Sequence, residues 1–394
     1  MNTDNSKNPI LSKNVSSSNG LEPLLRFPEF NDDWQETLLG KFCKITMGQS
    51  PDSTSYNNDC IGLPLVQGNA DMKNRITVPQ RYSSEPTKIV DKDTIILSVR
   101  APVGTVGRSD QKVCLGRGVC GIVSEEQEFM YQYLLKHENS WKSIEQGGTF
   151  TAINSDDIKS FKIYVPTKAE STKIAEFLSL VDERIEQQRQ LVEALKRYKR
   201  GYFQQIILGL DTTEFEVADV VKEYTEKTQT QNEYPILSST LSGIQLQNSY
   251  FNKQAASENT VGYKIVPYGY FTYRSMSDTG DFRFNLQTII DKGIVSPAYP
   301  VFSILDDHES EFVEYILNET DKIKNQLRII KEGGTRYALS FAKFKTLTIS
   351  LPTKQQQKNF VNQLRLFNKL LNREETIYID LQKHKSALLQ QMFI

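Results

Sequence analysis

The sequence predicts an α+β fold in which two globular domains alternate with two long helices as a pseudo-twofold internal repeat. Three observations carry this prediction: motifs that recur at one fixed offset, two long stretches with heptad spacing, and short β-rich segments ahead of each stretch. A length of 394 residues suits two or three domains. None of the apolar runs approaches the ~20 residues that a transmembrane helix needs.

Residues 1–20 are rich in Asn, Ser and Lys and lack the apolar core of a signal peptide. This composition predicts a disordered leader on a cytoplasmic protein. The four cysteines form no C-x-x-C pair and the chain has three histidines, so we expect no metal site. Reduced thiols are the first expectation in a cytoplasm. Cys114 and Cys120 are expected to be buried free thiols, with a pair between them as the alternative.

Three short motifs recur without a gap at an offset of 186 residues. They are Gly147-Gly148-Thr149 with Gly333-Gly334-Thr335, Pro166-Thr167-Lys168 with Pro352-Thr353-Lys354, and Gln204-Gln205 with Gln390-Gln391. Chance can supply one such match, but three in one register indicate a duplicated sequence. Each half of the chain therefore contains a globular domain followed by a helix.

The heptad stretches predict helices over residues 166–209 and 352–394. Residues spaced 4-3-4-3 form the seam of the first helix: Ile174, Leu178, Val181, Ile185, Val192 and Leu195, with Gln188 and Lys199 as polar exceptions. The repeat gives Phe360, Leu364, Phe367, Leu371, Leu381 and Leu388, with Glu374 and Lys385 at the same polar places. Since both stripes are alike, we expect the helices to pack on each other as an antiparallel coiled coil. The alternative is two unrelated amphipathic helices, each on its own globular core.

The globular domains, residues 21–165 and 210–351, read as mixed α/β. Short β-branched and aromatic segments predict strands at residues 94–100, 162–165, 269–273 and 346–351. One amphipathic helix is expected before each Gly-Gly-Thr motif, over residues 129–145 and 312–332. Asn154 or Ser155 is expected to cap a short turn that follows the first.

A search for catalytic motifs finds no phosphate-binding loop, no dinucleotide-binding glycine pattern and no amino-methyltransferase signature. The histidines do not stand near a nucleophile that they would activate. The acidic cluster of Asp306, Asp307, Glu309 and Glu311 is either a cation site or, as we expect, a solvated turn. We therefore predict no catalytic residue, no metal and no cofactor in this chain.

The net charge of -1, from 47 Lys+Arg and 48 Asp+Glu, argues against a free-standing nonspecific nucleic-acid binder. The basic residues are nevertheless uneven, with 11 against 7 acidic residues between Lys41 and Arg117. Arg suits guanine edges, and Asn and Gln suit adenine. The candidates for base or phosphate contact are Gln67, Asn69, Arg75, Ser98, Arg100, Arg108, Arg117, Thr149 and Phe150, followed by Tyr250, Lys253, Tyr273, Arg274, Arg283, Thr335, Arg336 and Tyr337. For any one of these arginines, a solvated or structural role is the alternative.

At this point the sequence resembles the specificity subunits of type I DNA restriction–modification systems. The start Leu25-Arg26-Phe27-Pro28-Glu29-Phe30 with Trp34 is similar to a common opening of these subunits. The run from Gly147 through Pro166 to Leu180-Val181-Asp182 resembles their central conserved region, and the segments 234–240 and 293–299 resemble a second target-recognition domain. The sequence departs from the family pattern at Ser171, at Gln356-Gln357 and at Asn368, which stands where the first copy has Asp182.

The resemblance implies that each globular domain reads one half of a bipartite, asymmetric site on double-stranded DNA. It implies that the paired helices set the spacing and dock two modification subunits that methylate adenine. The partner subunits would carry S-adenosylmethionine, ATP and Mg, with motor-nuclease subunits adding ATP-dependent restriction. Two other functions remain open: a fused nuclease or methyltransferase, and a coiled-coil adaptor without DNA specificity.

Overall fold

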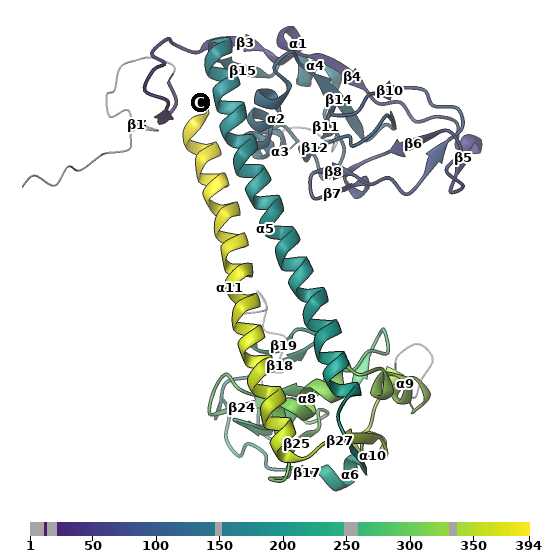
Figure 1. Ribbon diagram of the computed structural model, residues 1–394. Coiled ribbons are helices and arrows are strands. Elements are labelled where there is room, and N and C mark those ends of the chain that lie inside the picture. The colour runs from purple at the N-terminus through teal and green to yellow at the C-terminus, as the bar shows by residue number, and fades with distance from the viewer. Residues whose placement is uncertain (1–11, 14–21, 146–151, 248–258, 331–336) are drawn as a thin grey trace, which may run out of the picture. The chain divides into compact units, whose positions relative to one another are not determined.

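The computed structural model describes residues 12–13, 22–145, 152–247, 259–330 and 337–394 (Figure 1). The chain divides into two compact units. Unit 1 comprises Met1–Leu191 with Glu375–Ile394, and unit 2 comprises Val192–Glu374. Each unit therefore holds one globular domain and parts of both long helices, α5 (Lys168–Leu208) and α11 (Lys354–Met392). The boundary runs through the helices and not between helix and domain.

The globular part of unit 1 contains short strands and four short helices among its described residues. The helices are α1 (Leu39–Phe42), α2 (Gln127–Lys136), α3 (Glu138–Glu145) and α4 (Ser155–Lys159), with 3-10 turns η1 (Ser53–Ser55) and η2 (Asn69–Asp71). The strands are β1 (Ser12–Lys13), β2 (Leu25–Arg26), β3 (Gln35–Leu38), β4 (Lys44–Met47), β5 (Tyr56–Asn57), β6 (Leu63–Val66), β7 (Met72–Lys73), β8 (Ile76–Thr77), β9 (Tyr82–Ser83), β10 (Ile89–Val90), β11 (Ile95–Ser98), β12 (Val106–Arg108), β13 (Val113–Leu115), β14 (Val119–Val123) and β15 (Lys162–Val165).

Two larger sheets organise the described strands of unit 1. One has the order β10-β13-β6-β9-β5, and the other has the order β4-β14-β11-β12-β8-β7. β11 is the centre of the second sheet, since it pairs antiparallel with both β12 and β14. Its four residues are all buried, as expected for a strand covered on both faces. β3 lies apart and pairs with β15, which leads into α5.

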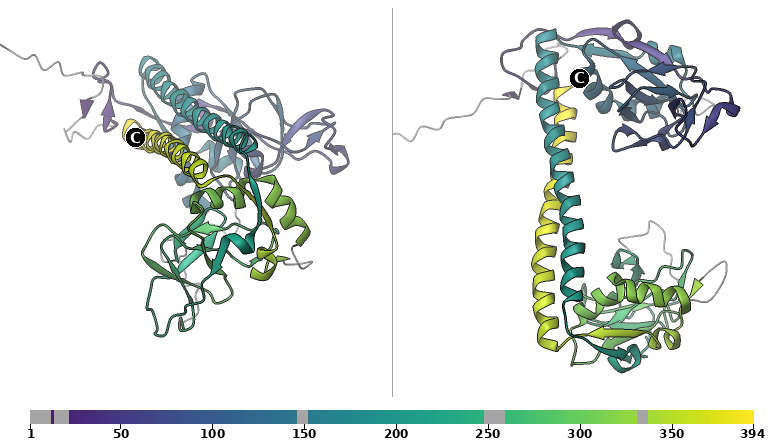
Figure 2. Two further views of the ribbon diagram at one scale, coloured as in Figure 1. Left: turned by 60° about the horizontal axis from the view of Figure 1, so that its bottom comes forward. Right: turned by 45° about the vertical axis from the view of Figure 1, so that its right-hand side comes forward.

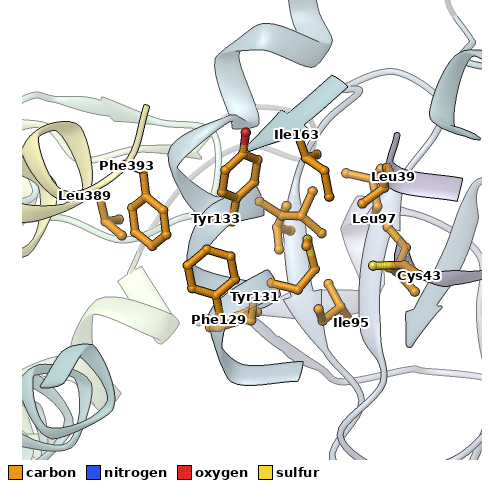
Figure 3. Close-up of a cluster of buried hydrophobic side chains, with 14 of the residues drawn as sticks. Leu39, Cys43, Ile95, Leu97, Phe129, Tyr131, Tyr133, Ile163, Leu389 and Phe393 are labelled. Atoms are coloured by element: carbon orange, nitrogen blue, oxygen red, sulfur yellow. The ribbon is translucent and has the colours of Figure 1, made fainter. Parts of the chain in front are cut away.

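The core of unit 1 forms where α2 meets the sheet and the last turns of α11. Phe129 and Tyr133 project from α2, and they are approached by Leu389 of α11 and by Phe393, which directly follows α11 (Figure 3). The ring of Phe393 lies 5.5 Å from that of Phe129 and 5.7 Å from that of Tyr133 between centroids. Residues from the end of the chain thus complete a core that the first half begins.

Unit 2 has smaller sheets within its described residues. Its strands are β16 (Thr213–Glu216), β17 (Val221–Glu223), β18 (Leu237–Thr240), β19 (Gly243–Leu246), β20 (Lys264–Pro267), β21 (Phe271–Thr272), β22 (Met276–Ser277), β23 (Asn285–Leu286), β24 (Lys292–Val295), β25 (Val301–Ile304), β26 (Tyr337–Ala338) and β27 (Thr348–Leu351). Its short helices are α6 (Val217–Val220), α8 (Ser310–Glu319), α9 (Asp321–Ile330) and α10 (Phe341–Lys345). The largest sheet has the order β17-β25-β21-β23, and its core is rich in stacked phenylalanines.

The duplicated sequence folds into duplicated structure. β3, α1 and β15 in unit 1 correspond to β16, α6 and β27 in unit 2, because each first strand pairs with the strand that precedes a long helix. The capped turns α4 and α10 also correspond. Asn154 accepts hydrogen bonds from the backbone of Asp156 and Asp157, and Ser340 accepts one from Lys343, so the expected cap at residue 154 is confirmed.

The long helices run side by side in opposite directions within each unit (Figures 1 and 2). In unit 1 the start of α5, with Ile174 and Leu178, packs with the end of α11, including Met392. In unit 2 the end of α5, with Phe203, packs with Phe360 and Leu364 at the start of α11. The α+β prediction with two long antiparallel helices is confirmed.

The predicted amphipathic helices are each broken in two, which corrects the sequence expectation of continuous helices over residues 129–145 and 312–332. The first ends at His137, whose ring packs on Tyr133 at 4.4 Å between centroids. The second ends at Thr320, which has extended backbone and whose hydroxyl donates to the carbonyl oxygen of Ile316. Such a hydrogen bond from a side chain competes with the helical backbone pattern.

All four cysteines are free, and Cys43, Cys114 and Cys120 are buried, so the expectation of reduced thiols is confirmed over a disulfide. Burial raises the pKa of Cys43 and of Cys120 to about 12. Across the described ranges, no helix is long and apolar enough to cross a bilayer. The same residues contain no cluster of three or more His, Cys, Asp or Glu arranged to hold a metal ion.

Candidate nucleic-acid interface

Three loops of unit 1 meet at the ends of interior strands and bring together candidates that are far apart in sequence. They carry Gln67 after β6, Arg100 after β11, and Arg117 between β13 and β14. The backbone N–H of Gly116 donates to the carbonyl oxygen of Val66 at 2.8 Å, and that of Val99 donates to the carbonyl oxygen of Gly118 at 2.9 Å. The three loops are therefore held by their backbones, which leaves the side chains available.

Glycine at position 118 is required by this close approach. A Cβ there would lie 2.0 Å from the carbonyl oxygen of Gln67. This distance is a severe clash, so any other residue would force the two loops apart. Arg100 and Arg117 are exposed, and in the described part of the chain neither guanidinium has an ion-pair partner. Gln67 is half-buried, with its amide 3.4 Å from the hydroxyl of Tyr56, and Asn69 is the half-buried first residue of η2.

Two other arginines of unit 1 are held by carboxylates. Arg75 lies with Asn74 in the left-handed turn between β7 and β8, donates to the carbonyl oxygen of Val106 at 3.1 Å, and forms an ion pair with Glu138. Arg108 forms a two-fold hydrogen bond with Glu128, at 2.6 and 2.5 Å, and its guanidinium lies 3.7 Å from the ring centre of Tyr131. Such bidentate pairs fix a side chain in place.

Ser98 and Tyr273 are buried, and the structure gives both a role in the fold. The Ser98 hydroxyl donates to the carbonyl oxygen of Pro102 at 2.8 Å and accepts from the N–H of Thr105 at the same distance. The Tyr273 hydroxyl donates to the carbonyl oxygen of Leu339 at 3.2 Å, and burial raises the pKa of this phenol. Because both side chains are buried, neither can contact DNA.

The candidates of unit 2 separate in the same way. Arg274 is exposed and, over the described ranges, has no ion-pair partner, whereas Arg283 faces Glu319 with 3.4 Å between Nη1 and Oε1. Tyr337 belongs to β26, where it pairs with Ser277 of β22. Six candidates lie outside the described residues: Thr149, Phe150, Tyr250, Lys253, Thr335 and Arg336.

The predicted seam residues lie along the facing sides of α5 and α11 within each unit, and all of them are buried or half-buried. Two polar seam residues are also covered. Gln188 is buried, and Lys385 forms an ion pair with Asp182, with 2.5 Å between Nζ and Oδ1. Sequence reasoning missed Asp182 as a seam partner, because the partner lies 203 residues away.

Comparison with known proteins shows which families and structures this chain resembles. The model of the type I restriction modification DNA specificity domain matches residues 31–197. A putative type I restriction enzyme MjaX specificity subunit from Methanocaldococcus jannaschii is 37% identical over 187 residues, which are 46% of this chain and 44% of that protein. The type I restriction enzyme MjaIX specificity subunit of the same organism is 31% identical over 116 residues, or 28% of this chain and 27% of that protein. The chain thus matches less than half the length of these curated relatives.

A solved structure extends the likeness in fold over nearly the whole chain. The S subunit of a type I restriction–modification system from M. genitalium matches with a TM-score of 0.57 over 95% of this chain and 99% of that one, at 14% identity. At that identity the match shows the fold. Residues 31–197 therefore match the type I restriction modification DNA specificity domain, and the chain has the same fold as that solved S subunit.

Proposed function

We propose that this chain is the non-catalytic DNA-recognition subunit of a type I restriction–modification complex and that each globular domain reads one half of a bipartite, asymmetric site. The observation that carries the proposal is the convergence of Gln67, Arg100 and Arg117 on one edge of the domain that matches the family model. Amide and guanidinium groups are the side chains that read base edges in the major groove. Arg75 and Arg108 hold the fold of that domain.

The paired helices would set the distance between the two half-sites and dock two modification subunits. A helix of 41 residues at ~1.5 Å per residue is about 60 Å long. Two globular domains joined through such helices would enforce a half-site spacing of about one turn of DNA, ~34 Å. S-adenosylmethionine, ATP and Mg belong in this proposal to the modification and motor-nuclease subunits, which methylate adenine and restrict DNA.

The charge of the chain supports a need for partners. With a net charge of -1 the chain lacks the excess of cations that strong phosphate binding demands. We expect the isolated chain to bind duplex DNA weakly at physiological salt, and the complex with modification subunits to bind tightly. Nanomolar, site-specific binding by the isolated chain, measured by fluorescence anisotropy, would contradict this part of the proposal.

The proposal is tested by mapping methylated adenines across the genome in cells with and without this chain. Methylation at one bipartite motif should depend on the chain. Exchanging residues 21–165 for the corresponding domain of another specificity subunit should then change one half of the motif and leave the other. Inserting four residues near Gly209, about one helical turn, should alter the gap alone. An insertion that rewrote the half-sites would refute the spacer role.

The same map separates the two classes of arginine in unit 1. Arg117→Ala should relax the motif at one position of the half-site assigned to residues 21–165. Arg108→Ala is the matched control, because it removes the pair with Glu128 and should lower stability without changing the consensus. A changed consensus with Arg108→Ala alone would reverse the assignment.

A further inference from the structure

A cleft of about 660 Å³ opens in the surface of unit 2. One wall is the hairpin β18–β19, which presents Ser238 and Thr240, and the other is the segment from Arg274 to Arg283. Its volume lies within the range of roughly 300–1,000 Å³ that is usual for binding sites. The DNA contacts proposed for unit 1 do not involve this cleft.

The hairpin wall is fixed from below by a buried amide. Asn285 is 1% exposed, and its Nδ2 donates to the Ser239 hydroxyl at 2.8 Å and to the carbonyl oxygen of Thr240 at 2.9 Å. Its Oδ1 and the hydroxyl of Thr272 are buried without a hydrogen-bond partner in the described structure. Buried polar groups without a partner cost stability, so the amide of Asn285 is placed here mainly to hold the hairpin.

The opposite wall carries charges of both signs. Arg274 is exposed and unpaired among the described residues, and Asp281 lines the same cleft. The Thr279 hydroxyl donates to Oδ2 of Asp281 at 2.9 Å, which orients the carboxylate and leaves Oδ1 available. Arg283, also in the lining, is tied to Glu319 and helps to hold the segment.

This mixture of charges distinguishes a base edge from a phosphate. A carboxylate in the same cleft as the cation repels a phosphate group, so a backbone contact would favour a cleft without Asp281. The major-groove edge of a G·C pair presents two acceptors on guanine, N7 and O6, and one amino donor on cytosine. Arg matches the guanine acceptors, and a carboxylate matches the cytosine amino group.

We propose that this cleft reads one G·C pair of the half-site recognised by unit 2, with Arg274 donating to guanine and Asp281 accepting from cytosine. The inference rests on the proposed function, since it requires that unit 2 reads DNA. It adds the base pair that is read and names the two residues that specify it. Ser238 lines the neighbouring wall, where its hydroxyl would contact an adjacent base, whereas the Thr240 hydroxyl donates to the carbonyl oxygen of Gly243 and belongs to the hairpin.

The test uses methylated-adenine maps from cells that carry the full chain with its natural partners. The half-site of unit 2 is the one that survives exchange of residues 21–165. With Arg274→Ala, one G·C position in that half should lose its preference by about 10- to 100-fold, the usual weight of a bidentate contact. Arg274→Lys keeps the positive charge but loses the bidentate guanidinium. The base preference at the same position should therefore weaken while overall methylation persists. Asp281→Asn should relax the same base pair.

Arg328→Ala is the matched control, since Arg328 lies on α9 in the same unit, outside the cleft, where it donates to Asn325 at 3.2 Å. Its motif should be unchanged. Thermal melting of each purified chain shows whether the variant is folded. If Arg274→Ala does not fold, the motif of Arg274→Lys tests the assignment instead. An unchanged consensus with methylation weakened evenly at all sites would mean a phosphate contact and would overturn the assignment.

Two outcomes separate the inference from the function on which it rests. If the unmodified chain directs no bipartite motif, the proposed function fails. If the motif exists but the half read by unit 2 lacks a G·C pair, or Arg274→Ala leaves the motif intact, the cleft assignment alone fails.

Discussion

The two units start their long helices with different chemistry at equivalent positions. In unit 1 the first turn of α5 buries Glu170, which is 1% exposed at its side chain, against Arg26, which is 2% exposed. Nε and Nη2 of Arg26 each lie 2.8 Å from a Glu170 oxygen, and the indole of Trp34 is 3.4 Å from Oε1. The hydrogen bond to Glu170 raises the pKa of the Arg26 guanidinium.

In unit 2 the repeat places Gln356 where unit 1 has Glu170, so a carboxamide replaces the buried carboxylate. Gln357 is buried, donates to the carbonyl oxygen of Pro352 at 2.8 Å and accepts from the N–H of Glu309 at 2.9 Å. A buried ion pair adds little net stability over neutral packing, but breaking it leaves a buried charge. Equivalent helix starts are therefore held by a buried ion pair in unit 1 and by amide hydrogen bonds in unit 2. The ion pair is the more sensitive to substitution of one partner.

The largest expected effect comes from Glu170→Gln. It should lower the free energy of unfolding of unit 1 by about 3–5 kcal/mol, because Arg26 stays charged and buried. Urea denaturation measures the change. The matched variant Gln356→Ala should cost less than about 1 kcal/mol, since it removes a cap on Thr353 with oxygen distances of 2.9 and 3.1 Å. Equal losses would refute the contrast between the units.

The second effect concerns the ion pair between the helices of unit 1. Asp182→Asn should destabilise unit 1 by about 1–3 kcal/mol, because burial already lowers the pKa of Lys385 and the Asp182 carboxylate opposes that shift. Asn368 is the repeat equivalent in unit 2, and Asn368→Asp should change stability by less than about 1 kcal/mol. Parallel urea titrations of the two variants measure both changes. A loss with Asn368→Asp as large as that with Asp182→Asn would contradict it.

The third effect depends on pH and belongs to unit 1. Burial lowers the pKa of His137 to about 4, with Lys136 adding to the shift. Because the folded pKa lies below the unfolded value of ~6.5, protonation favours unfolding. The contribution of His137 is complete above pH ~6.5 and is lost progressively as the pH falls towards 4. At pH 5.5 the loss relative to pH 7.5 should be roughly 1 kcal/mol.

His137→Gln should remove this part of the acid sensitivity, and thermal melting between pH 7.5 and 5.5 measures it. His384→Gln serves as the control, since His384 is exposed on the part of α11 that belongs to unit 1. If both variants kept the full slope of the parent chain, His137 would not be the titrating group.

The smallest expected effect concerns a feature that the two units share, the capped short helices α4 and α10. Asn154→Ala and Ser340→Ala each remove the cap of a short helix before the strand that leads into α5 or α11. Each should cost about 0.5–1 kcal/mol in its own unit. Asn154 accepts two backbone hydrogen bonds and Ser340 one, so a larger loss for Ser340→Ala would break the equivalence.

The fold could be predicted largely because its signals are local and repeated. Heptad spacing and a fixed offset define α5 and α11, and the helix over Lys168–Leu208 begins two residues after Pro166. The breaks at His137 and Thr320 could not be predicted, since they depend on a ring contact and a side-chain hydrogen bond. Local composition indicates the candidate arginines, but it does not distinguish an arginine that is free to contact DNA from one that is held by a carboxylate. The carboxylates that hold Arg75 and Arg108 lie 63 and 20 residues away.

The division of unit 1 between the two ends of the chain determines the order in which the protein becomes complete. Trp34, Phe129 and Tyr133 are covered by Phe393, which is synthesised after all of unit 2. At ~5–20 residues per second, the ribosome needs roughly 10–40 s to pass through unit 2. Unit 2 is continuous and finishes first. The domain that is synthesised first therefore exposes part of its aromatic core until Phe393 is available. It is the part of the nascent chain that most needs protection from aggregation.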